Sequence, residues 1–442
     1  MARLIIGHVT HESAHIWVRG TEAGNWAKVT LSKEGETVGH KWLQLEQRHG
    51  YTGCLEFKKL SHASAYQCQV AFSHSKNTPD YLMMDFGHCR GKFKTAPKPK
   101  SDVPVSFILG SCNLHSLGIF SSPDTAYEKL MDKAMENDCD FMLHCGDQIY
   151  YDIPNPAKSP SLEGYRQKYL DAWGDCRPAR ALLTQLPHYM ILDDHEITND
   201  FANDFNPPGH ASTAGDFKRD AMKVYREFVH IRQPNPFPQS YYYWFSFGRA
   251  EFFVMDTRTE RWAHQKDETD NQIVSQTQLD ELKKWLSKHA QAPKFIVTSV
   301  PFVGHVRNNQ DKWCHPIFSH QREQLIDFIA ANKLEKICFL TGDMHSSYHA
   351  TMEIQTAEHS LMIHELMSSP INQLHKSNLD DFHSSIKATT KNNTQYHSRI
   401  LKSEFYNEHS NALLIRLEKD EVQWEIFRTK RKKSEKNRKF NL

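Results

Sequence analysis

Four short polar segments, each directly after a run of apolar residues, constrain the fold of this chain more than any other feature. Helical spacing recurs between the apolar runs, for example over 124–137 and 321–331. Such alternation predicts a mainly parallel sheet with helices on its faces. In a sheet of this kind the site lies at the carboxyl ends of the strands, so we expect the four segments to meet. They are Gly110-Ser111-Cys112, Gly146-Asp147-Gln148-Ile149-Tyr150, Asp193-Asp194-His195-Glu196 and Gly342-Asp343-Met344-His345.

The residue patterns divide the chain into three parts. Residues 1–97 alternate polar and apolar positions between Gly and Ser breaks, which predicts a small all-β sandwich. Two prolines mark 96–101 as a linker. Residues 104–428 carry the strand–helix alternation and end in a predicted hairpin over 412–417 and 422–427. The basic segment 429–442 predicts a disordered tail, with weak contact to an anionic surface as the alternative.

Composition indicates which kinds of binding partner and which cellular compartment to expect for the protein. Lys and Arg number 54 against 53 Asp and Glu, so no overall field favours a stable nucleic-acid complex or a membrane surface. The nine cysteines are odd in number and lack regular CxxC spacing, which indicates reduced thiols. No apolar stretch or twin arginine marks an export signal at the N-terminus. We therefore expect a soluble, cytoplasmic protein, with export by a specialised route or a removed leader as alternatives.

The residue types in the four segments suit a pair of metal ions. Two such ions would lower the pKa of a bound water and neutralise charge on phosphoryl oxygens, so hydrolysis of a phosphate ester is the predicted reaction. Asp147 is the expected bridging carboxylate. The thiolate, phenolate and imidazole donors suit a transition metal such as Fe³⁺. The carboxylates suit Ca²⁺, Mn²⁺ or Mg²⁺. The predicted donors are Cys112, Tyr150 and His345 for the first ion and Asp147, Asp194 and Asp343 for the second.

Other polar residues have more than one interpretation. His195 is expected to lie nearest the substrate without binding metal and to protonate the leaving oxygen. Arg258 is expected either to hold a substrate phosphate or to form an ion pair with Asp256 or Glu260. His144, inside a predicted strand, is interpreted as a hydrogen-bonded core histidine.

In combination, these motifs resemble the PhoD-type alkaline phosphatases of the calcineurin-like metallophosphoesterase superfamily. Further matching pieces are Asp256-Thr257-Arg258, Ser299-Val300-Pro301 and Glu365-Leu366-Met367-Ser368-Ser369-Pro370. Their order and rough spacing match over 104–370, and the all-β segment fits the sandwich that precedes the catalytic domain in this family.

The resemblance implies a two-sheet αββα core, phosphomonoesterase or phosphodiesterase activity, and a centre of iron with calcium. It also implies that Asp147 belongs to both ligand sets, and that His195 is the catalytic histidine. Whether Asp193 or Asp194 reaches metal is left open, although adjacency to His195 favours Asp194. Leu192 and His315 depart from the usual family pattern and concern substrate choice more than metal binding.

Two other functions compete with this one. A purple-acid-type phosphatase also fits Gly146-Asp147 with Tyr150, and a phosphoesterase scaffold retained only for binding fits the presence of the N-terminal sandwich. The complete ligand set argues against a lapsed enzyme.

Overall fold

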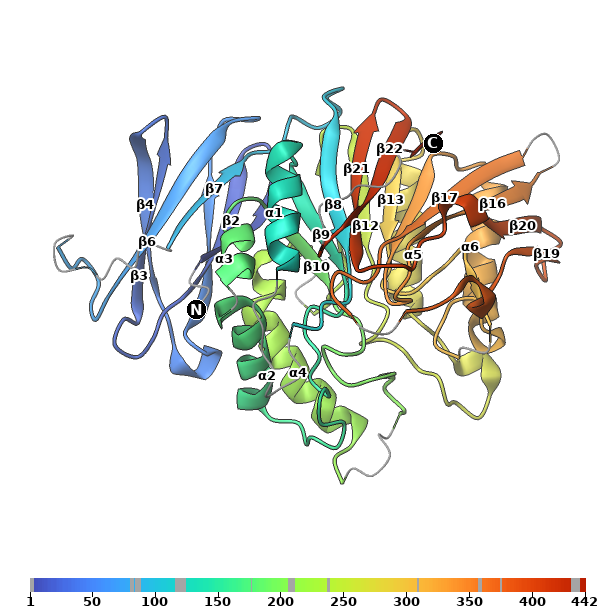
Figure 1. Cartoon of the computed structure of the whole chain (residues 1–442), viewed down its shortest axis with the longest axis horizontal. Coiled ribbons are helices and arrows are strands. Elements are labelled where there is room, and N and C mark those ends of the chain that lie inside the picture. The colour runs from blue at the N-terminus through green and yellow to red at the C-terminus, as the bar shows by residue number, and fades with distance from the viewer. Residues whose placement is uncertain are drawn as a thin grey trace.

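The computed structural model describes residues 4–79, 83, 89–115, 125–175, 177–205, 211–236, 239–307, 310–356, 360–373, 376–430 and 438–442. A small β-sandwich at the N-terminal end packs against a larger core in which helices flank two sheets (Figure 1). The predicted αββα core preceded by an all-β sandwich is therefore confirmed.

Within the described residues, seven strands in two sheets form the sandwich. One sheet has the order β1 (Leu4–Val9), β2 (Ser13–Arg19) and β5 (Thr52–Lys58); the other has the order β4 (Glu36–Gln44), β3 (Trp26–Lys33), β6 (Ala65–Ser73) and β7 (Arg90–Lys94). Period-two patterning over 13–19, 28–32, 54–57 and 66–72 predicts strands that correspond to β2, β3, β5 and β6. The strands β1, β4 and β7 were not predicted. In β1 almost every residue is buried, so that its sequence does not alternate.

The sandwich and the core share one hydrophobic cluster. Tyr189 of the core hydrogen-bonds His8 of β1, with 3.0 Å between the hydroxyl oxygen and Nδ1. A Cβ atom on Gly7 would lie 2.5 Å from the carbonyl oxygen of Arg232, so glycine is required where β1 meets the core. The predicted linker contacts the sandwich, because the backbone N–H of Ala96 donates to the carbonyl oxygen of Thr10, the residue after β1. The sandwich is thus packed firmly against the core.

The core contains one six-stranded and one eight-stranded sheet. The first has the order β10 (His188–Ile191), β9 (Phe141–Cys145), β8 (Val105–Gly110), β21 (Asn411–Glu418), β22 (Glu421–Arg428) and β23 (Arg438–Asn441). The second has the order β11 (Tyr243–Phe247), β12 (Ala250–Val254), β13 (Lys294–Val297), β15 (Ile337–Thr341), β17 (Ser360–Met367), β16 (Tyr348–Gln355), β20 (Gln395–Ile400) and β19 (Ser385–Thr389). A short ribbon pairs β14 (His305–Val306) with β18 (Phe382–His383). The predicted hairpin over 412–427 corresponds to β21 and β22.

Only part of each sheet is parallel: one side of the six-stranded sheet and the centre of the eight-stranded sheet. Strands β8, β9 and β10 pair in parallel, as do β12, β13, β15 and β17, whereas the C-terminal hairpin joins β8 in antiparallel pairing. The sequence predicted a single mainly parallel sheet from residue patterns alone, because local periodicity does not reveal how many sheets the strands form. The parallel strands of both sheets nevertheless end at the same edge of the core.

The described helices carry apolar stripes toward the sheets, and three of them begin at side-chain caps. They are α1 (Ala126–Glu136), α2 (Leu162–Tyr169) continued by the π-helical η3 (Leu170–Asp175), α3 (Arg177–Leu183), α4 (Ala214–Phe228), α5 (Gln276–Lys288) and α6 (Ser319–Ala331). Ser161 and Ser275 accept hydrogen bonds from the backbone of α2 and α5, and Thr213 with Asp216 forms a capping box on α4. Figure 1 shows α1 and α3 beside the sheet that contains β8, with α5 and α6 toward the opposite side of the molecule.

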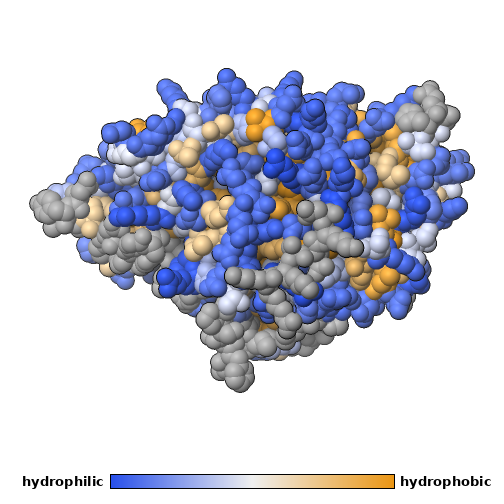
Figure 2. All heavy atoms as spheres, turned by 45° about the horizontal axis from the view of Figure 1, so that its top comes forward, coloured by the Kyte–Doolittle hydropathy of each residue, from blue (hydrophilic) through white to orange (hydrophobic). Residues whose placement is uncertain are grey.

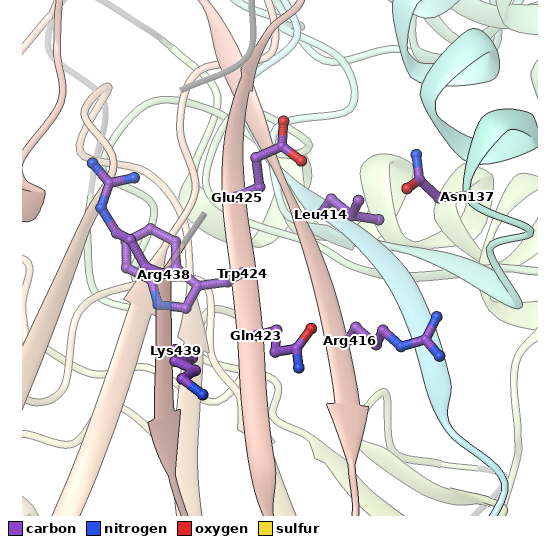
Figure 3. A pocket seen from close by; sticks show the side chains of 8 residues that line it. All are labelled: Asn137, Leu414, Arg416, Gln423, Trp424, Glu425, Arg438 and Lys439. Atoms are coloured by element: carbon purple, nitrogen blue, oxygen red, sulfur yellow. The ribbon is translucent and has the colours of Figure 1, made fainter. Parts of the chain in front are cut away.

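The C-terminal segment corrects one prediction. Residues 438–441 form β23, paired antiparallel with β22, and are not disordered. The charge-rich sequence concealed this strand because Phe440 supplies its only aromatic anchor, stacking on His364 with 4.0 Å between ring centroids. Arg438 and Lys439 line a hollow of about 420 Å³ beside Trp424 (Figure 3). Residues 431–437 lie outside the described ranges.

Hydrophilic side chains predominate on the face that Figure 2 presents, with small apolar patches between them. None of the helices in the described ranges combines the length and the hydropathy needed to cross a membrane.

Candidate metal centre

Turns from the two sheets meet at the shared edge of the core. The backbone N–H of Cys112, after β8, donates to the carbonyl of Gly146, after β9. Asp343, after β15 of the other sheet, donates its N–H to Ser111 Oγ at 3.3 Å. A Cβ atom on Gly342 would lie only 2.6 Å from the Ser111 side chain, so that glycine permits this approach. Residues more than 200 positions apart in sequence therefore lie in one cluster.

The first group of potential ligands consists of Cys112, Asp147 and His345, whose donor atoms all lie within 4.8 Å of one another. Cys112 Sγ lies 3.3 Å from Asp147 Oδ2. The Tyr150 hydroxyl donates to the same Oδ2 at 3.2 Å and lies 3.5 Å from His345 Nε2. Four potential donors thus lie close together: a thiol, a phenol, an imidazole and a carboxylate.

The second group consists of Asp147, Asp194 and His195, again within 4.8 Å. Asp147 belongs to both groups, as expected of a bridging ligand. His195 Nδ1 lies 2.7 Å from Asp152 Oδ1, a contact that orients the imidazole. The Tyr150 ring lies 4.2 Å from that of His195, between centroids. The sequence motifs gave no signal for Asp152, although it directly follows the turn over 146–151.

Asp193 and Asp194 have different surroundings. Asp193 binds the Arg258 guanidinium and accepts a hydrogen bond from Ser299 Oγ at 2.7 Å. Asp194 instead lies with Asp147 and accepts the backbone N–H of Asp200. The geometry therefore favours Asp194 over Asp193 as a ligand.

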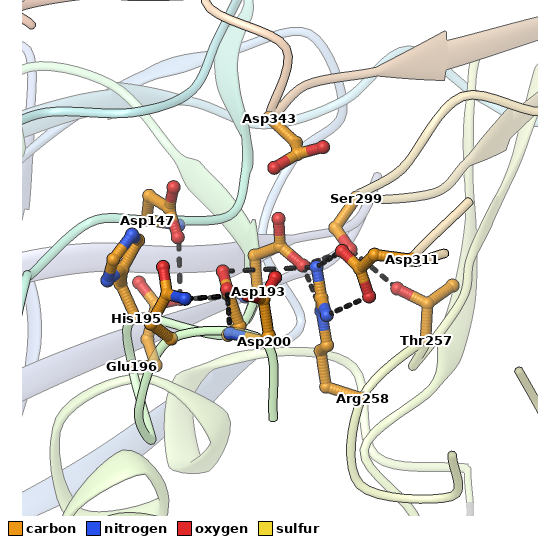
Figure 4. Close-up of polar contacts among 12 residues, drawn as sticks. Asp147, Asp193, His195, Glu196, Asp200, Thr257, Arg258, Ser299, Asp311 and Asp343 are labelled. Carbon is orange, nitrogen blue, oxygen red and sulfur yellow. Dashed lines mark hydrogen bonds and ion pairs between the residues drawn. The ribbon is translucent and has the colours of Figure 1, made fainter. Parts of the chain in front are cut away.

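Arg258 is fully buried between carboxylates (Figure 4). Its Nη1 and Nη2 atoms each lie 2.7 Å from an oxygen of Asp311, and Nε binds Asp193. An ion pair was among the expectations for Arg258, but the expected partners Asp256 and Glu260 are wrong. The contacts of the guanidinium are with the carboxylates of Asp193, Asp194 and Asp311, which favours the ion-pair interpretation.

Asp343 is the predicted ligand that neither group includes. Its carboxylate contacts the ammonium of Lys312, which also lies 2.8 Å from Asp311 Oδ2. Lys312 is almost fully buried, with its side chain 3% exposed. Sequence motifs gave no signal for it, since it lies in a loop outside the four segments.

Glu196, the last residue of the Asp-Asp-His-Glu motif, connects two of the turns. Its buried carboxylate accepts the backbone N–H groups of Asp147, Gln148 and Asp193. Glu365 supports another loop in the same way, accepting three consecutive backbone N–H groups from residues 302–304. Both glutamates hold loops in place from behind the site.

The backbone at the site is strained. Cys112, Asp147, Asp343 and His345 all have φ between 51° and 74°, in the left-handed region that residues with a Cβ atom rarely adopt. Strain of this kind costs roughly 1–3 kcal/mol for each residue and gathers at functional sites.

The electrostatics of the two groups fit a cation. Burial raises the pKa of Asp147, of the Cys112 thiol and of the Tyr150 phenol well above their usual values, and neighbouring carboxylates raise each pKa further. Asp147 Oδ1 is buried without a hydrogen-bond partner among the described residues. Burial alone lowers the pKa of His195, but Asp194, Asp147 and Asp152 outweigh it and raise that pKa well above the usual value. A positive ion would stabilise the charged form of each acidic donor.

His144 lies in the core, as expected, but it is not hydrogen-bonded. Neither ring nitrogen has a partner among the described residues. Burial lowers its pKa to about 3.

The model of the family described as PhoD-like phosphatase matches residues 107–426. Alkaline phosphatase D of Bacillus subtilis (strain 168) is 28% identical over 367 residues, covering 72% of this chain and 60% of that protein, so the chain spans less than two thirds of this relative's length. A solved structure of PhoD has a TM-score of 0.73 at 18% identity, covering 100% of this chain and 88% of the other. Purple acid phosphatase PPD1 from yellow lupin (Lupinus luteus) seeds has a TM-score of 0.62 at 12% identity, covering 99% and 74%. At these identities the two structures show a shared fold.

Proposed function

The chain belongs to the PhoD-like phosphatase family, and from this premise we propose that it is a metal-dependent hydrolase of phosphate monoesters, diesters or both. The observation that supports the proposal is the meeting of two donor groups that share Asp147 at the edge of the core. One shared carboxylate between two sets of donors is the arrangement that a two-metal site requires.

We assign the two groups to different ions. Cys112, Tyr150 and His345 with Asp147 would hold Fe³⁺, because thiolate, phenolate and imidazole suit a transition metal. Asp147 and Asp194, with Asp343 as a further predicted ligand, would hold a second divalent ion, Ca²⁺ by preference with Mn²⁺ or Mg²⁺ as alternatives. When bound, the pair would supply a nucleophile at neutral pH and neutralise charge on the phosphoryl oxygens.

His195 has the position of a proton donor to the leaving oxygen. Asp152 binds its Nδ1, which leaves the Nε2 side of the ring to face reactants beside Asp147 and Asp194. A neighbouring carboxylate that holds one ring nitrogen sets both the tautomer and the direction of the other. Proton donation of this kind contributes about 10²–10⁴-fold to a rate.

The experiment is hydrolysis by the purified chain loaded with Fe³⁺ and Ca²⁺, with p-nitrophenyl phosphate as the monoester and bis(p-nitrophenyl) phosphate as the diester. We expect turnover of at least one ester, loss on chelation, and visible absorption from a ferric phenolate. Asp147→Asn is expected to remove both turnover and the absorption band. His195→Ala is expected to lower kcat at least 100-fold and to keep the band.

Asp140→Asn is a matched control, because Asp140 is a carboxylate of the same sheet that accepts the backbone N–H of Ser106, away from the centre. Failure of the iron-loaded chain to hydrolyse either ester would refute the proposal and favour the binding scaffold. Hydrolysis with an optimum below about pH 6 would favour the purple-acid alternative.

A further inference from the structure

A row of acidic and basic side chains in alternation lies next to the metal centre. It begins at Asp194, whose Oδ1 lies 3.8 Å from Arg258 Nη2, and continues through the paired contacts between Arg258 and Asp311. Lys312 then connects Asp311 with Asp343. Figure 4 shows Arg258 between Asp193 and Asp311, with Asp343 above them. The first and last residues of this row, Asp194 and Asp343, are carboxylates predicted to bind the second metal ion.

Asp194 and Asp343 differ in how closely a basic side chain of the protein contacts them. Asp194 lies within 4.8 Å of Asp147 and His195, and its nearest guanidinium nitrogen is 3.8 Å away. Asp343 contacts the Lys312 ammonium directly, and it belongs to neither donor group. Lys312 therefore contacts the carboxylate that the second ion would need as a ligand.

Burial makes this contact strong. The Lys312 side chain is 3% exposed and that of Asp343 is 18% exposed, so water screens their attraction poorly. The ammonium has a second fixed partner in Asp311, which the two guanidinium nitrogens of Arg258 hold in turn. Lys312 cannot move freely away when a second cation arrives, and the two like charges would repel at short range.

We propose that Lys312 is an internal counter-ion that competes with the second metal ion for Asp343 and so weakens the binding of that ion. This inference rests on the proposed metal site and adds a residue that controls its affinity. The second ion would then exchange with solution more readily than it would in the absence of the Lys312 ammonium.

The test measures the affinity of the iron-loaded full-length chain for Mn²⁺ alone, after removal of other divalent ions with a chelator. Free Mn²⁺ is counted by electron paramagnetic resonance, so that no turnover is needed. We expect Lys312→Met to bind the second ion at least tenfold more tightly than the wild type. Lys312→Arg, which keeps the charge, is expected to stay within threefold of the wild type.

Two further variants separate competition from other effects. Lys294→Met removes another buried lysine, one that donates to three backbone carbonyls and lies away from the centre, and should leave the Mn²⁺ affinity unchanged. In an Asp343→Asn background, Lys312→Met should lose most of its effect, because the contested carboxylate is absent. If Lys312→Met does not fold, Lys312→Gln keeps a hydrogen-bonding group toward Asp311 and should show the same gain.

Unchanged or weaker Mn²⁺ binding in folded Lys312→Met or Lys312→Gln would overturn the proposal. A gain of equal size in the Asp343→Asn background would also overturn it. These outcomes are distinct from failure of the proposed function, which is absence of ester hydrolysis by the wild type.

Discussion

Replacing Arg258 by methionine should destabilise the fold strongly, because the guanidinium neutralises carboxylates that water cannot reach. Its side chain is 0% exposed, and its partners Asp193 and Asp311 are 1% and 13% exposed. Three charge-assisted hydrogen bonds, one to Asp193 and two to Asp311, would be lost. Removing one partner of a buried ion pair costs about 3–5 kcal/mol, because the remaining charges stay buried. We therefore expect the free energy of unfolding to fall by about 4 kcal/mol.

The assay is urea unfolding of the metal-free chain at neutral pH, followed by circular dichroism. Arg258→Lys keeps the charge but loses the two parallel bonds to Asp311, so about half of the loss is expected. Arg219→Met is the matched control. Arg219 also contacts two carboxylates, Asp216 and Asp220, but its side chain is 66% exposed, so the cost should stay below about 1 kcal/mol.

The opposite interpretation of Arg258, a residue that holds substrate phosphate, makes the opposite prediction. It requires a raised KM for the ester in Arg258→Lys with unfolding unchanged. A loss below about 1 kcal/mol in Arg258→Met, together with such a rise in KM, would refute the structural role argued from burial.

Three further changes test other parts of the structure. Burial lowers the pKa of His144 to about 3, so its contribution to stability is complete above its ordinary pKa of 6.5 and is lost as pH falls toward 3. The unfolding free energy of His144→Leu should therefore fall by about 2 kcal/mol less between pH 7 and pH 5 than that of the wild type. An equal fall in the two proteins would contradict this prediction. Gly342→Ala should cost about 1–3 kcal/mol in urea unfolding because its Cβ would overlap neighbouring turns, whereas Gly215→Ala, in an open position of α4, should be neutral or stabilising. Asp152→Asn should lower kcat through misorientation of His195 while metal content, measured by elemental analysis, stays constant; lost metal would indicate a ligand-holding role instead.

Local patterns were sufficient to predict most of the architecture. Strands β2, β6, β8, β9 and β15 are apolar or alternating over their whole length, so the sequence alone located them. The rule that parallel strands end at one edge then predicted that Cys112, Asp147, Asp194 and His345 would come together, and the structure brings them together. The family was also recognisable, because several motifs had to occur in the same order.

Other features depend on contacts that sequence patterns do not record. The division of the strands between two sheets is set by long-range pairing, such as that of β21 with β8. β23 forms because a single aromatic residue, Phe440, stacks on His364, and a charge-rich segment with one aromatic residue resembles a solvated tail.

The least predictable residues are those that keep the donors in place. Glu196 was recognisable as part of a polar motif, but only the structure shows that its carboxylate joins the turns after β9 and β10 through backbone N–H groups. Lys312 belongs to no motif, yet it contacts the one predicted ligand, Asp343, that stands apart from both donor groups. A sequence motif records which groups a reaction needs, whereas the charges that hold those groups can come from any loop that reaches them. The proposed competition by Lys312 would make the affinity of the centre for a second ion depend on a residue whose position only the folded chain determines.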